Sequence, residues 1–253
     1  PMVALGSLLI STDTVMAPFY ATALYFFGRL TEARAPRFAL LAGVAIGAAF
    51  MAKYAAVYFL IGVALIQIAP AYRIGWRNGA LMLAGFAAVI SPNIWWNLSH
   101  KLTTFSHTVD NVGWLRGGAA LHPAGMAEFL VSQAAVMGPV VLIAMLIGLR
   151  RVPAMAAFVL PPLAVVTVQA LLGTAQANWA LAAYFAGTVL AVQVLRGHPR
   201  WLIASFAVNA VVCLGLPLLT IFTALTFPNG KPLLDRQLGR VQMSQQIIAL
   251  AHQ

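Results

Sequence analysis

A single lysine interrupts a long apolar segment near the start of this chain. Lys53 is the only charged residue between positions 38 and 69, and arginines flank that segment on both sides. A straight helix of this length would measure roughly 48 Å, whereas the hydrocarbon core of a bilayer is about 30 Å thick. If both flanking loops lie on one side of a membrane, the segment must cross and return. Lys53 is then predicted at the tip of a helical hairpin, on the far side of the bilayer.

The composition is typical of a multi-pass membrane protein. Hydrophobic residues make up 62% of the chain and charged residues 8%, whereas soluble proteins carry about 25% charged residues. The formal net charge of +10 comes from basic residues in short loops between apolar spans, without a basic stripe interleaved with aromatic residues. This pattern argues against a nucleic-acid partner and is explained by the positive-inside rule of membrane proteins.

The charges divide between two sets of loops, which predicts about eight membrane spans. One set holds nine of the 15 lysines and arginines but one of the five acidic residues; we call it the arginine loops, at positions 29–37, 73–77, 150–151 and 196–200. The positive-inside rule assigns these loops to the cytoplasm. The predicted spans are 14–29, 38–52, 54–70, 79–96, 125–149, 153–172, 179–196 and 201–227. The expected fold class is an all-α, multi-pass transmembrane helical bundle.

Polar residues gather on the opposite face, where we expect the functional site. Asp13 precedes the first full span, so it lies on the same face as Lys53. The longest polar loop is 97–124, and a later turn on this face carries Asn178 and Trp179. This sidedness favours an enzyme working at the outer leaflet over a transporter, because a transport path needs polar groups near the middle of the membrane.

Each of these residues also has a plainer interpretation. Asp13 could simply cap the helix that follows it, and Lys53 could extend its ammonium group to lipid headgroups. His100, His107 and Asp110 suggest a metal site, but their spacing matches no strong ligand pattern. No cofactor is therefore predicted, and a divalent cation stays open because of the charges of Asp13 and Asp110.

The first arm of the hairpin, residues 38–52, carries two glycines four residues apart. Gly43 and Gly47 form a small-xxx-small pattern, which lets membrane helices approach each other closely. This arm would be only about 22 Å long as a helix, which is shorter than the hydrocarbon core. We therefore expect it to pack tightly on a neighbour and to hold Lys53 below the outer membrane surface.

Four short motifs occur along the chain in an order that is known from one family. They are Ser11-Thr12-Asp13-Thr14, Met51-Ala52-Lys53-Tyr54, Ser91-Pro92-Asn93 with Trp96-Asn97, and Ala177-Asn178-Trp179 with Ala183-Tyr184. The ordered set resembles the polytopic glycosyltransferases of the GT-C fold that are related to protein O-mannosyltransferases and to the lipid A aminoarabinose transferase. The resemblance covers nearly the whole chain.

This resemblance implies transfer of a sugar from a polyprenyl-phosphate carrier to a lipid, glycan or protein acceptor, on the outer face of a bacterial-type inner membrane. By similarity, Lys53 would meet the carrier phosphate and Asp13 would support the sugar or the acceptor. Candidates for the cavity lining are Tyr54, Asn97, His107, Asn178 and Trp179. Family members carry their main catalytic carboxylate in the first outer loop, so we expect that group to precede Pro1, outside this chain.

Residues 1–227 are expected to form the transmembrane core, truncated at its start, and residues 228–253 a linker into a further extramembrane region. Two other functions stay open. A transporter or flippase of a lipid-linked or small anionic substrate would use Lys53 as its anion site; an inverted repeat in the sequence would favour this function, and none is evident. A non-catalytic membrane scaffold would tolerate the replacement of both Asp13 and Lys53.

Overall fold

The computed structural model describes residues 11–104, 106, 121–219, 226 and 240–251. Its regular elements are helices, which confirms the predicted all-α class. The α-helices are α2 (Thr12–Ala33), α3 (Pro36–Ala52), α4 (Val57–Ile66), α5 (Trp76–Ser99), α7 (Pro123–Met137), α8 (Pro139–Arg151), α9 (Ala156–Leu172), α10 (Ala182–Leu195), α11 (Pro199–Leu219) and α12 (Arg240–Ala251). Short 3₁₀ turns connect some of them: η1 (Tyr54–Ala56), η2 (Pro70–Tyr72), η3 (Pro153–Met155) and η4 (Ala177–Ala180).

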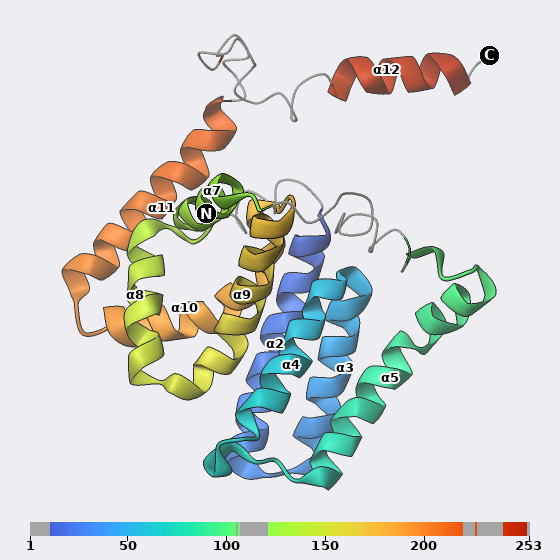
Figure 1. The fold of residues 1–253 in the computed structure, drawn as a ribbon, viewed down its shortest axis with the longest axis vertical. Helices are drawn as coiled ribbons and strands as arrows, with labels where there is room; N and C mark the ends of the chain where they lie inside the picture. Colours follow the sequence, from blue (N-terminus) through green and yellow to red (C-terminus); the bar gives the residue numbers. More distant parts are fainter. Residues whose placement is uncertain (1–10, 105, 107–120, 220–225, 227–239, 252–253) are drawn as a thin grey trace.

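One apolar core joins the first and second halves of the chain. In the first half, α3 packs against both α2 and α5, and in the second half α10 packs against α8 and α9 (Figure 1). The link between the halves is aromatic, because the ring of Phe59 on α4 lies 5.9 Å from Tyr20 on α2 and 5.6 Å from Phe158 on α9, between ring centroids. All three side chains are buried. Segments far apart in sequence are therefore held in fixed positions around this core.

The first arm of the predicted hairpin packs closely on α5. A Cβ atom added to Gly43 would lie 2.0 Å from the carbonyl oxygen of Met82, and one added to Gly47 would lie 2.8 Å from Cβ of Val89. In the other direction, a Cβ atom on Gly85 would lie 2.9 Å from the carbonyl oxygen of Leu40. These distances are shorter than van der Waals contact, so the predicted tight packing through small residues is confirmed.

Fewer helices than predicted are long enough to cross a membrane. Two of the described helices are long and apolar enough to cross a membrane, namely Trp76–Ser99 and Pro153–Leu172. The pair Pro123–Met137 and Pro139–Arg151 would make a third if the two helices count as one broken span. The other apolar helices, among them α3 and α10, are shorter. The predicted number of eight spans is not confirmed, although long apolar helices typical of a membrane protein are present.

A sharp bend divides the region predicted as one span over residues 125–149. There α7 ends at Met137, α8 begins at Pro139, and their axes differ by 104°. Gly138 between them has φ of 92°, a left-handed conformation that favours glycine, and proline at the start of α8 has no N–H to donate to the preceding turn. Residues 125–149 are therefore not one straight helix, and they form a single span only if the two helices count as one broken span.

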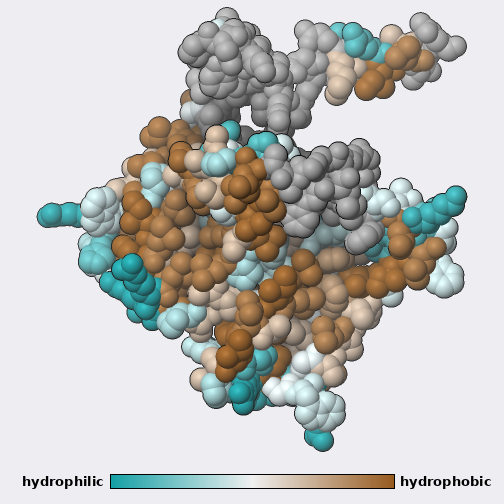
Figure 2. Space-filling model, viewed as in Figure 1, coloured by the Kyte–Doolittle hydropathy of each residue, from teal (hydrophilic) through white to brown (hydrophobic). Residues whose placement is uncertain are grey.

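Three of the four arginine loops, at positions 29–37, 73–77 and 150–151, share one end of the helical bundle. The guanidinium group of Arg34 donates a hydrogen bond to the carbonyl of Ala71, 3.1 Å away, and Arg29, Tyr72 and Val152 line one hollow of about 760 Å³. Figure 1 shows the α2–α3 and α8–α9 turns at the lower end, whereas α2 begins at the upper end. Figure 2 shows hydrophobic side chains across much of the surface between the ends. This arrangement gives the bundle two chemically different ends.

Candidate functional site

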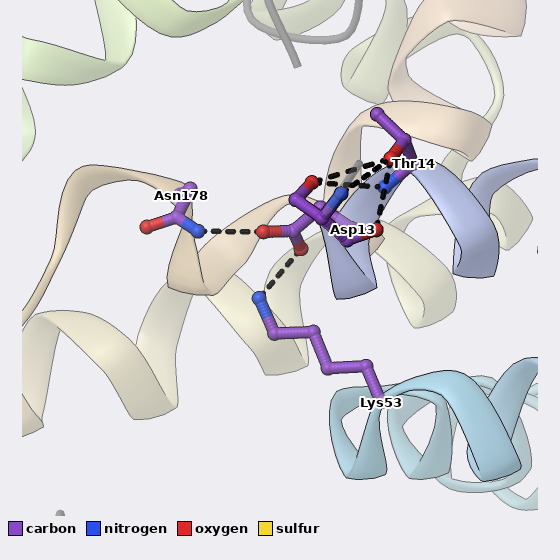
Figure 3. Close-up of polar contacts among 5 residues, drawn as sticks. Asp13, Thr14, Lys53 and Asn178 are labelled. Carbon is purple, nitrogen blue, oxygen red and sulfur yellow. Dashed lines mark hydrogen bonds and ion pairs between the residues drawn. The ribbon is translucent and has the colours of Figure 1, made fainter. Parts of the chain in front are cut away.

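Three segments that are distant in sequence meet at the upper end of the bundle (Figure 3). The Nζ atom of Lys53 lies 2.5 Å from Oδ1 of Asp13, and Nδ2 of Asn178 donates a hydrogen bond of 2.6 Å to Oδ2 of the same carboxylate. Asp13 is 8% exposed. Both of its oxygens therefore have a partner, one a cation and the other a neutral amide.

The start of α2 is stabilised by residues other than Asp13. Ser11 is the N-cap: its hydroxyl accepts a hydrogen bond from the backbone N–H of Thr14, and the Thr14 hydroxyl accepts one from the backbone N–H of Ser11. This reciprocal pair satisfies two backbone donors at the helix start. The interpretation of Asp13 as merely the helix cap is therefore wrong, and its carboxylate is directed to Lys53 and Asn178. A carboxylate in the first turn is also favoured by the helix dipole.

Lys53 lies at the break between α3 and η1, as the length of the apolar segment predicts. Its backbone is extended, with φ of −157° and ψ of 127°. Its N–H still donates to the carbonyl of Ala49, and its carbonyl accepts from the N–H of Ala56, so the chain turns without leaving these backbone groups unpaired. Its side chain is 20% exposed and its ammonium group contacts Asp13. That position differs from an ammonium group extended to lipid headgroups.

A hollow of about 690 Å³ opens beside the Lys53–Asp13 pair. Of the residues predicted to line the cavity, Tyr54 and Trp179 do so together with Lys53, and its other lining residues are Thr12, Phe50, Met51, Ala52, Ala55, Val57, Tyr58, Asn93, Thr104 and Val166. The hollow thus combines aromatic and aliphatic walls with a few polar groups. That combination is common in sites for small organic ligands.

Asn97 and Asn178 are not among the lining residues of the hollow, although both were predicted there. Asn97 is buried behind the hollow, where its amide donates to the carbonyl of Asn93 at 2.9 Å and its oxygen accepts from the N–H of Thr104 at 3.2 Å. It therefore supports two lining residues instead of lining the hollow itself. His107 lies outside the described residues. Asn178 contacts the site through Asp13, from the side of η4.

Two polar groups near the site were not singled out from the sequence. The hydroxyl of Tyr54 donates to Oδ1 of Asn93 at 3.3 Å, which places the amide of Asn93 on the wall of the hollow. Gln133 on α7 is 2% exposed and donates to the carbonyl of Ala177, next to Asn178. A polar side chain within an apolar helix is the sequence signal that both share, because burying such a group requires a hydrogen-bonding partner.

The described residues include no group of three histidine, cysteine or acidic side chains close enough to hold a metal ion. What the site offers is a fixed ammonium group, a carboxylate held by two partners, and an adjacent hollow. An ammonium group in a partly buried position attracts an anion more strongly than it would in water. The arrangement is able to bind a ligand that has an anionic group next to an apolar or aromatic portion.

Comparisons with known proteins agree with the resemblance predicted from the motifs and confirm it. Residues 1–96, which include Asp13, Lys53 and Asn93, match the dolichyl-phosphate-mannose-protein mannosyltransferase family. Over 265 aligned residues the chain is 38% identical to the lipid A galacturonosyltransferase RgtD of Rhizobium johnstonii, in an alignment that covers 100% of this chain and 56% of that relative. The chain thus spans about half the length of this curated relative. No solved structure matches the chain significantly.

Proposed function

We propose that this chain is the core of a membrane glycosyltransferase, because its residues 1–96 match the dolichyl-phosphate-mannose-protein mannosyltransferase family and the chain is 38% identical to a lipid A galacturonosyltransferase. In this proposal, a sugar moves from a polyprenyl-phosphate carrier to an acceptor on the non-cytoplasmic face of the membrane. The single observation that carries the proposal is the contact of Lys53 with Asp13 at the rim of the hollow, within the part of the chain that matches the family.

Lys53 binds the phosphate of the donor in this mechanism. An ammonium group has three N–H donors, and among the described residues Nζ of Lys53 hydrogen-bonds to Asp13 alone. The two remaining donors can reach phosphate oxygens while the contact with Asp13 persists. Negative charge grows on the leaving phosphate as the glycosidic bond breaks, so a fixed cation stabilises the transition state more than the ground state.

Asp13 is assigned a supporting role on the side of the sugar or the acceptor. The bond between the anomeric carbon and the phosphate oxygen breaks, a bond between that carbon and the acceptor oxygen forms, and the acceptor proton passes to a base. Both oxygens of Asp13 already accept short hydrogen bonds from Lys53 and Asn178. Asp13 does not itself line the hollow, so we propose that it supports the sugar or acceptor side by holding Lys53 and Asn178 in place, while another group takes the proton.

The two ends of the bundle support an orientation in the membrane. Three of the four arginine loops lie at the end opposite the Lys53–Asp13 pair, and the positive-inside rule assigns such loops to the cytoplasm. The site would then face the periplasm or the exterior. Polyprenyl chains are apolar, and the hollow beside Lys53 has aromatic and aliphatic walls that suit the first units of such a chain.

The name of the relative suggests which substrates to test first. RgtD is a lipid A galacturonosyltransferase and is 38% identical to this chain. We therefore propose polyprenyl-phosphate galacturonic acid as the first donor and lipid A as the first acceptor. A divalent cation could assist, so the assay is run with and without one.

The test is a transfer assay with the full-length protein in liposomes that hold a radiolabelled polyprenyl-phosphate sugar and lipid A. We expect label in the acceptor and release of unlabelled polyprenyl phosphate. Label that crosses the bilayer while it stays on the carrier would instead indicate a flippase and contradict the proposal. Absence of both transfer and movement, with a panel of hexosyl and uronosyl donors, would contradict it as well.

A further inference from the structure

A buried polar pair lies one layer behind the Lys53–Asp13 contact. Gln133 on α7 is 2% exposed and Tyr184 on α10 is 6% exposed. The Tyr184 hydroxyl donates a short hydrogen bond to Oε1 of Gln133. Neither side chain is among the lining residues of the hollow, so a role in direct substrate contact does not account for them.

The Gln133 amide connects three helical elements. Its Nε2 donates to the carbonyl of Phe129 on its own helix at 2.8 Å and to the carbonyl of Ala177 on η4 at 3.3 Å. Its Oε1 accepts from Tyr184 on α10. Ala177 is the first residue of η4, and Asn178 follows it. The amide therefore ties α7 and α10 to the turn that holds Asn178.

The backbone carbonyls of Phe129 and Ala177, which can only accept, fix which way this amide faces, and the hydroxyl of Tyr184 completes the arrangement. A glutamine amide has an accepting oxygen on one side and a donating nitrogen on the other. A donor at Oε1 leaves the nitrogen facing the carbonyls of Phe129 and Ala177, as observed. The flipped amide would set its oxygen against the carbonyl of Ala177, and two acceptors at that distance repel each other. Without Tyr184 the observed orientation loses one of its buried partners.

We propose that Gln133 and Tyr184 are positioning residues that set Asn178 against Asp13, an inference that rests on the proposed glycosyltransferase function. The 2.6 Å hydrogen bond from Asn178 to Asp13 depends on the backbone of η4, and Gln133 holds that backbone one residue earlier. Trp179, the next residue, lines the hollow. A shift of η4 would therefore move both the carboxylate's amide partner and one wall of the hollow.

The test compares variants that alter this pair with a control on the same helix. Tyr184→Phe keeps the ring and removes the hydroxyl, and Gln133→Met keeps the length of the side chain and removes the amide. The control is Thr188→Val, whose hydroxyl donates at 2.7 Å to the backbone carbonyl of Tyr184, within α10. Each full-length protein is labelled with 5-fluorotryptophan, and the ¹⁹F resonance of Trp179 is assigned with Trp179→Phe.

We expect kcat of Tyr184→Phe and of Gln133→Met to fall on the order of tenfold, because misplacing a positioned group weakens transition-state contacts. We expect KM for the donor to change less than about twofold, since Lys53 is untouched. The Trp179 resonance should shift in both variants, whereas Thr188→Val should leave kcat and the resonance unchanged.

An unshifted Trp179 resonance in Tyr184→Phe would overturn the inference whatever the activity. A shifted resonance with unchanged kcat in an active enzyme would overturn it too, because the turn would then move without consequence for the reaction. If the unmodified protein transfers no sugar at all, the proposed function fails, and a shift of the Trp179 resonance would still support the structural half of the inference. If Gln133→Met does not fold, Tyr184→Phe alone decides.

Discussion

The ammonium nitrogen of Lys53 lies 2.5 Å from a carboxylate oxygen of Asp13, although 40 residues separate them in the sequence. The contact joins the break after α3 to the first turn of α2. It occurs at the end of the bundle opposite three of the four arginine loops, beside a hollow of about 690 Å³. Each of the expectations below depends on this pair or on the packing that brings its two helices together.

Removing one charge of the pair should destabilise the protein more than removing both. Lys53→Ala leaves the buried carboxylate of Asp13 with one neutral partner, Asn178. Leaving a buried charge unpaired costs on the order of 3 kcal/mol. The double variant Asp13→Asn/Lys53→Ala removes both charges, so its melting temperature in detergent should recover much of the loss. If the decrease in melting temperature of the double variant equalled the sum of the decreases for Asp13→Asn and Lys53→Ala, the two residues would not interact.

Introducing a negative charge at position 178 should lower the activity more than truncating the side chain. Asn178→Ala removes one hydrogen bond to a carboxylate, worth about 1.5–3 kcal/mol. Asn178→Asp places a second carboxylate at the position from which Nδ2 now reaches Asp13 over 2.6 Å, and among the described residues Lys53 is the one cation in contact with Asp13. We expect kcat in the transfer assay to fall about tenfold for Asn178→Ala and further for Asn178→Asp. Equal activities of the two variants would contradict the geometry.

The close approach of α3 and α5 should tolerate no added methyl group at its centre. Gly43→Ala places Cβ 2.0 Å from the carbonyl oxygen of Met82, a backbone atom that has little room to move. Overpacking of this kind costs about 1–3 kcal/mol. The matched control is Gly28→Ala on α2, where no atom lies within 4 Å of the added Cβ. Thermal unfolding should show a lowered transition for Gly43→Ala alone, and similar transitions for both variants would argue against this helix contact.

The orientation of the bundle is testable by chemical labelling of intact cells. Single cysteines replace Glu32, near the arginine loops, and Leu121, an exposed residue before α7, in a background that carries Cys213→Ser. Glu32→Cys keeps every basic residue that orients the protein. A membrane-impermeant maleimide should modify the cysteine at 121 and should modify the one at 32 only after lysis. The opposite pattern would reverse the proposed orientation and place the site in the cytoplasm.

Parts of this fold are predictable from the sequence because charge and length constrain them. An apolar segment too long for one crossing, with one lysine inside it, predicts the break at Lys53, and the alternation of loops predicts Asp13 on the same face. The glycine spacing predicts the contact of α3 with another helix, but it does not identify α5 as the partner. These features follow from local patterns and from the properties of the bilayer.

Other parts depend on contacts that no local pattern encodes. Asn178 is 165 residues from Asp13, and its hydrogen bond follows from the packing of α9 and α10 against the first half of the chain. The bend between α7 and α8 is missed by hydropathy, because both helices are apolar; a proline such as Pro139 indicates a kink or a helix end, but it does not give the angle of the bend. The polar neighbours of Asn97 turn it away from its expected place in the lining.

The most direct test of the account is the affinity of the site for polyprenyl phosphate without a sugar. The full chain is compared as Asp13→Asn and as Asp13→Asn/Lys53→Ala, so that both proteins lack the carboxylate and differ only in the ammonium group. Neutral polyprenol of the same length is the control ligand. The account predicts that Kd for the phosphate rises at least about tenfold when Lys53 is lost, as expected for a charge-assisted contact, while binding of polyprenol is unchanged. Equal Kd values for the phosphate in the two proteins would contradict the central role given to Lys53.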